Sequence, residues 1–111
     1  MLDERQIMLK QVELVASQLL AGAKSRTLTL KLRTLVRYAY TSYVKGTLDF
    51  PTIRGSAHRC KPPNWMVSQL FYRQAERALA KRLNAKVVRR KGQVYVVLEK
   101  REEKKALIAE A

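Results

Sequence analysis

Apolar residues recur at helical spacing near the start of the chain. Over residues 3–21, one stripe is formed by Met8, Val12, Val15 and Leu19. Because residues three or four apart share one face of a helix, this stripe predicts a helix that packs that face against a core. Asp3 is a suitable N-cap, and Gly22 marks the end. Ile7 and Leu14 would lie on the other side, where a partner chain or the C-terminal segment would cover them.

Residues 28–45 fit two patterns. Apolar and polar side chains alternate at the start, as in a half-buried strand, with Leu28, Leu30 and Leu32 as the apolar positions. A helical stripe beginning at the same place continues to Tyr43, so its greater length predicts a helix that ends at Gly46. Tyr38 lies on the outer face and is a candidate for ligand contact. The basic residues of that face are Lys31, Arg33, Arg37 and Lys45.

Residues 47–64 form the one long stretch without regular periodicity, and prolines and a glycine interrupt it. A connection of this length inside a compact domain usually has a function of its own or hides a strand. Four of its side chains can meet phosphates: Arg54, His58, Arg59 and Lys61.

A third helix is predicted from residue 64 to residue 83, with Asn64 as its N-cap. Its apolar arc consists of Val67, Phe71, Ala75, Ala78, Leu79 and Leu83. The opposite arc carries Gln69, Arg73, Arg77 and Lys81, each four residues from the last. No acidic residue interrupts this row, since Glu76 lies at its edge. Because all charges in this row are positive, we interpret it as a binding face and not as a merely solvated one.

Two runs of strand-forming residues follow at positions 86–98, separated by Lys91 and Gly92. They predict an antiparallel hairpin with a basic tip made of Arg89, Arg90 and Lys91. Residues 99–111 mix both signs of charge with good helix formers, which predicts a short helix or a tail.

These elements predict an α+β fold: one three-helix domain over residues 1–98 with a C-terminal antiparallel hairpin, followed by the segment 99–111. Three helices followed by a hairpin with a basic tip resemble a winged-helix domain in outline across residues 3–98. The 18-residue connection before the third helix departs from the short turn of a helix-turn-helix.

Charge narrows the choice of partner. The chain has a net charge of +14. Residues 24–97 carry seventeen Lys or Arg against two acids, Asp49 and Glu76, a net charge of +15. Such a cationic field repels itself and is stabilised by a polyanion, of which nucleic acid is the first candidate.

The predicted nucleic-acid-binding residues come from the two basic helix faces, the long connection and the hairpin tip. They are Lys31, Arg33, Arg37, Arg54, Arg59, Lys61, Gln69, Arg73, Arg77, Lys81, Arg89, Arg90 and Lys91.

Other classes of function find little support in the residues. A zinc site needs about four ligands, and the chain has one histidine, His58, and one cysteine, Cys60. Two acids and one histidine within the basic segment offer little for acid–base or metal catalysis, so we expect neither an enzyme nor a cofactor or metal. The acidic N-terminus and the lack of a long uncharged apolar run argue against a signal peptide and a membrane span. We expect a protein of the cytoplasm or nucleoid, not a secreted one.

Two non-catalytic functions remain. An RNA-binding component of a ribonucleoprotein, such as the ribosome, is narrowly preferred because the positive charge is spread over several elements. The alternative is a double-stranded DNA-binding winged-helix regulator or chromatin protein, which the third helix and the hairpin would suit. Anionic membranes and acidic protein partners are weaker candidates, and Ile7 and Leu14 offer a possible protein contact.

Overall fold

A computed structural model describes residues 3–100, which form four α-helices, one 3₁₀-helix and a three-stranded antiparallel sheet. The predicted α+β class is confirmed. The elements are α1 (Glu4–Gly22), β1 (Thr27–Lys31), α2 (Leu32–Lys45), α3 (Phe50–Ser56), η1 (Asn64–Val67), α4 (Gln69–Leu83), β2 (Lys86–Arg90) and β3 (Gln93–Glu99).

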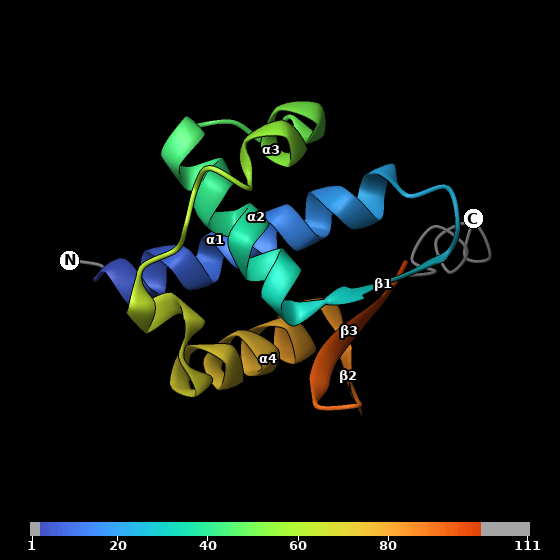
Figure 1. The fold of residues 1–111 in the computed structure, drawn as a ribbon. Coiled ribbons are helices and arrows are strands. Elements are labelled where there is room, and N and C mark those ends of the chain that lie inside the picture. The colour runs from blue at the N-terminus through green and yellow to red at the C-terminus, as the bar shows by residue number, and fades with distance from the viewer. Residues whose placement is uncertain (1–2, 101–111) are drawn as a thin grey trace.

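Helix α2 lies at the centre of the molecule, in front of α1 and between two other helices (Figure 1). Helix α3 lies on one side of α2, and α4 lies on the opposite side together with the β2–β3 hairpin. The core fills the space between α1, α2, α4 and the sheet. Its largest fully buried side chains include Phe71, Leu32, Leu35, Met66, Leu79 and Leu98.

Helix α1 follows its sequence prediction within one residue. The carboxylate of Asp3 accepts a hydrogen bond from the backbone N–H of Gln6 at 2.8 Å, which caps the first turn. The predicted stripe faces the core: Met8, Val12 and Val15 are buried, and Leu19 is half-buried against them.

The first part of the predicted second helix is instead a strand. β1 pairs with β3, and the buried Val96 and Leu98 of β3 lie opposite Leu30 and Leu28. The alternation of apolar and polar residues therefore indicated a half-buried strand correctly. The helix begins only at Leu32. The helical stripe favoured the wrong structure because β1 is stabilised by a partner strand some 65 positions later, which local periodicity does not report.

The long connection contains a helix rather than a loop or a hidden strand. Helix α3 is capped by Asp49, whose carboxylate accepts hydrogen bonds from the backbone N–H of Thr52 at 3.3 Å and from its hydroxyl at 2.6 Å. Pro51 lies in the first turn, where its missing N–H costs nothing. Ile53 is fully buried and anchors α3 to the body of the protein.

The third predicted helix starts later than expected. Asn64 is not an N-cap; it opens the 3₁₀-helix η1, and the true cap of α4 is Ser68, whose hydroxyl accepts from the N–H of Phe71 at 3.2 Å. The change of geometry turns Val67 outward, where it is 44% exposed, and buries Met66 in its place. From Phe71 onward the predicted arc is confirmed.

The hairpin is confirmed, with β3 as the central strand of the sheet order β1-β3-β2. Its turn consists of Lys91 and Gly92, at φ 50° and φ 76°. Positive φ at both positions is the geometry of a tight hairpin turn, and it explains the glycine. A helix or tail was predicted over residues 99–111; Glu99 instead ends β3, and residues 101–111 lie outside the described residues.

Candidate nucleic-acid interface

The outer face of α4 is mainly polar and cationic, and its one large apolar residue is Leu70, which is 56% exposed. Gln69, Arg73, Arg77 and Lys81 are all exposed. Within residues 3–100 none of the three cations forms an ion pair. The ion pairs of α4 lie on its other sides, where Arg82 contacts Glu13 of α1 at 3.8 Å and Glu76 contacts Arg89 of β2 at 3.3 Å. The sequence-predicted row is therefore a continuous exposed surface, which we call the α4 face.

The long connection does not cover the α4 face. It leaves α2 at the end where α3 lies, on the opposite side of α2 from α4, and it returns through η1 to the start of α4 (Figure 1). The departure from a short helix-turn-helix turn thus leaves α4 exposed to a ligand. The hairpin reaches out beside α4 on the same side of the molecule.

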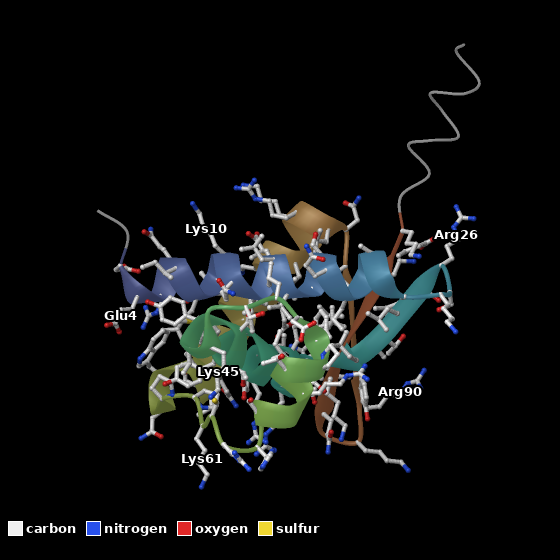
Figure 2. All side chains as sticks on the ribbon, turned by 90° about the horizontal axis from the view of Figure 1, so that it is seen from above. Glu4, Lys10, Arg26, Lys45, Lys61 and Arg90 are labelled. Atoms are coloured by element: carbon white, nitrogen blue, oxygen red, sulfur yellow. The ribbon has the colours of Figure 1, made fainter. Side chains whose placement is uncertain are left out.

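The hairpin tip carries two free cations rather than three. The guanidinium of Arg89 donates a hydrogen bond to Oε1 of Glu76 at 3.3 Å, so its charge is partly offset by a neighbour. Arg90 and Lys91 are exposed and have no acidic partner in residues 3–100. Arg90 projects from the side of the molecule away from α1 (Figure 2).

A second basic surface is concave. A cavity of about 400 Å³ lies between the start of α2, α3 and the first residue of β3. The permanent cations that line it are Lys31, Arg33, Arg37 and Arg54. No acidic residue of the described chain lines it. These four were predicted from separate stretches of sequence, and the folding of α3 onto α2 brings them together.

Tyr72 of α4 is half-buried and feels the charge of two arginines of α2. Burial raises the pKa of its hydroxyl above the ordinary value, while the nearby guanidiniums of Arg33 and Arg37 act in the opposite direction. Two arginines of the cavity are therefore close enough to a side chain of α4 to influence its ionisation.

The remaining predicted residues lie outside both groups. Arg59 and Lys61 are exposed on the connection after α3, and neither lines the cavity. Lys61 projects on the side away from α1, as Arg90 does (Figure 2). They can extend a binding surface but do not form part of a shaped site.

Several cavity residues were not among the predicted site residues. Thr34, Tyr38, His58 and Gln93 contribute a hydroxyl, a phenol, an imidazole and an amide to its wall. The ring of Tyr38 is held by an edge-on contact with Phe50, with the ring centroids 6.4 Å apart. Tyr38 and His58 had been noted from the sequence as candidates for ligand or phosphate contact. Gln93 had no sequence signal, because only the hairpin register brings it to the cavity.

The described residues offer neither a metal site nor a membrane span. Within residues 3–100 no three His, Cys, Asp or Glu side chains gather where a metal ion could be held. In the same range no helix combines the length and the apolar character needed to cross a membrane.

Comparison with known proteins adds no relative. No protein-family model matches the chain, and neither the curated proteins nor the solved structures give a significant match.

Proposed function

We propose that this protein is a non-catalytic nucleic-acid-binding protein. In contrast to the narrow preference for RNA drawn from the sequence, we propose double-stranded DNA as its preferred ligand, because the exposed face of α4 suits a major groove. The single observation that carries the proposal is the α4 face, a helix surface of four exposed polar and cationic side chains with no acidic partner within residues 3–100. Arginine and glutamine side chains can contact base edges in the major groove, and lysine and arginine neutralise phosphates.

The hairpin supports this mode of binding. Its exposed cations, Arg90 and Lys91, lie at the end of a two-stranded arm beside α4. A helix in the major groove leaves the flanking backbone within reach of such an arm, which would supply affinity without reading much sequence. The winged-helix outline rests on this arrangement and stays part of the proposal.

The near-neutral first helix would serve the fold rather than the ligand. Within α1 the acids Glu4 and Glu13 balance the basic Arg5 and Lys10. Bound DNA would lie along the outer face of α4 and the hairpin. The proposed location of the protein is accordingly the nucleoid or the cytoplasm.

Structured RNA is the second candidate, and the cavity favours it. Lys31, Arg33, Arg37 and Arg54 place positive charge on a surface that a straight duplex lying along α4 would not reach in full. A folded RNA can bend its backbone around several faces of a small protein, so it would use both surfaces.

Parallel titrations separate the two candidates. A DNA duplex and a folded RNA of equal phosphate number are titrated at several salt concentrations. Tighter binding of the duplex is expected, because the major groove of B-DNA admits an α-helix, whereas the deep, narrow major groove of an RNA helix does not. Tighter binding of the RNA would replace the DNA proposal by the ribonucleoprotein one. No binding of either at low salt would reject nucleic acid as the partner.

A further inference from the structure

The cavity beside α2 has features of a ligand site that nucleic-acid binding along α4 does not require. Its four permanent cations come from β1, α2 and α3, and none pairs with an acidic residue in residues 3–100. Like charges gathered in a concavity repel one another, and an anion bound among them would remove that repulsion. The cavity is thus built to be occupied by negative charge.

The local fold adds to this preference. Helix α2 begins at the cavity, its N-cap position is the basic Lys31, and its first turn contains no acid. The partial positive charge of the helix start is therefore added to the side-chain charges instead of being offset by a capping carboxylate. Asp49, the acid of the neighbouring segment, is engaged in capping α3 through Thr52.

The charge in the cavity matches a terminal phosphate better than an internal one. A backbone phosphodiester carries one negative charge, whereas a phosphomonoester carries about −1.5 to −2 at neutral pH and presents three acceptor oxygens. A guanidinium, such as that of Arg33, Arg37 or Arg54, can bind two such oxygens at once through two parallel N–H···O hydrogen bonds. Thr34 and Gln93 supply neutral polar groups beside them.

The volume of the cavity and its aromatic wall indicate which kind of molecule carries the phosphate. About 400 Å³ exceeds what a phosphate alone needs and lies within the usual range for small-molecule sites, roughly 300–1,000 Å³. Tyr38 lines the cavity with a ring whose position Phe50 fixes. Aromatic rings of this kind stack on nucleobases.

We propose that the cavity between α2, α3 and β3 binds a nucleotide by its terminal 5′-phosphomonoester, with Arg33, Arg37 and Arg54 on the phosphate and Tyr38 against the sugar or base. The same chemistry occurs at the 5′-phosphorylated end of a nucleic-acid strand and in a free nucleoside monophosphate. The site goes beyond the function proposed for α4 and does not depend on it.

The test compares probes that differ only in the phosphate. One pair is a short single-stranded oligonucleotide with a 5′-phosphate and the same strand with a 5′-hydroxyl. The other pair is a nucleoside 5′-monophosphate and its nucleoside. Each is titrated by calorimetry against the wild type, the cavity variant Arg37→Gln/Arg54→Gln, and the matched variant Arg73→Gln/Arg77→Gln, which removes equal charge from the α4 face.

The wild type is expected to prefer the phosphorylated member of at least one pair by about tenfold or more, the factor for one additional charge-assisted hydrogen bond. The cavity variant should lose this preference, and the α4 variant should keep it. A preference in the oligonucleotide pair alone identifies a strand end as the ligand, and one in the nucleoside pair alone identifies a free nucleotide.

Equal binding of both members of both pairs by the wild type would overturn the proposal, as would a preference that survives in the cavity variant. Circular dichroism confirms that both variants keep the fold, which is expected because the four substituted side chains are exposed. Duplex binding by the α4 variant is measured separately. Its failure to weaken would contradict the proposed function while leaving the cavity proposal standing.

Discussion

Helices α1 and α4 have similar lengths and both pack one face on the same core, yet their outer faces differ in charge. In α1 two acids and two bases balance, and the exposed surface includes Leu14, which is 49% exposed. In α4 the outer face holds Gln69, Arg73, Arg77 and Lys81, with no acid among them. A helix that only completes a core tolerates either sign of charge on its outer face, so the uniform sign of α4 needs a second cause. The proposed nucleic-acid ligand would supply that cause.

The largest expected effect is that of salt, which screens the positive charges of α4 and the hairpin from phosphates. If phosphate contacts on the α4 face and the hairpin dominate, affinity for a DNA duplex should fall by about 10³–10⁵ between 50 and 200 mM salt, as for proteins with 6–10 such contacts. Fluorescence anisotropy at stepped salt concentrations measures the slope. Affinity that barely changes with salt would show that the charged surface is not what binds.

The effect of substitutions on the free energy of unfolding distinguishes the inner face of α4 from its outer face. Phe71 is fully buried and meets Trp65 edge-on, with the ring centroids 5.5 Å apart. Phe71→Ala should lower the free energy of unfolding by about 3–5 kcal/mol, from lost burial and the cavity left behind. Arg73→Ala, on the exposed face, should change it by no more than about 0.5 kcal/mol. Urea denaturation of both variants checks this, and a similar loss in both would mean that the outer face serves the fold.

The next prediction tests whether the hairpin turn requires a residue that tolerates positive φ at position 92. Gly92 has φ 76°, a conformation that β-branched residues avoid, so Gly92→Val should destabilise the protein by about 1–3 kcal/mol even without ligand. Lys91→Asn is the matched control, because asparagine tolerates the positive φ found at Lys91. Thermal melting of the two variants measures the difference. An unchanged melting temperature for Gly92→Val would show that the turn adopts another geometry.

The smallest expected effect concerns the hairpin charges. Replacing Arg89, Arg90 and Lys91 by Ala should reduce the salt slope of duplex binding by about two contacts rather than three, at about one contact per phosphate-binding cation. Arg89 is the exception because it already pairs with Glu76. Single Arg89→Ala should therefore leave the slope nearly unchanged, while Arg90→Ala lowers it. Equal slopes for the wild type and the triple variant would place the hairpin away from the ligand.

Much of this architecture could be predicted because its determinants are local. The stripes of α1 and α4, the Asp3 cap and the Lys91–Gly92 turn each lie within a few residues of the structure they specify. The α4 face was predicted for the same reason, since four-residue spacing fixes which side chains share a helix face.

The parts that were missed depend on distant partners or on short signals. β1 depends on pairing with β3 across most of the chain, so its local pattern was outweighed by a longer helical one. Helix α3 has only seven residues, and Pro51, which lies in its first turn, was among the residues taken to interrupt regular structure. The cavity could not be predicted at all, because it exists only once α3 lies against α2 and places Arg54 near Arg37.

Reversing the charges on the outer faces of the two compared helices, α4 and α1, tests the central claim most directly. One variant carries Arg73→Glu, Arg77→Glu and Lys81→Glu on α4. The control carries Arg5→Glu, Lys10→Glu and Lys24→Glu, on α1 and just beyond its end, and changes the net charge equally. With circular dichroism unchanged, the α4 variant should lose duplex binding at 150 mM salt while the control stays within a few-fold of the wild type. Equal losses in both would show that net charge alone attracts the ligand, and full affinity in the α4 variant would show that the α4 face is only solvated.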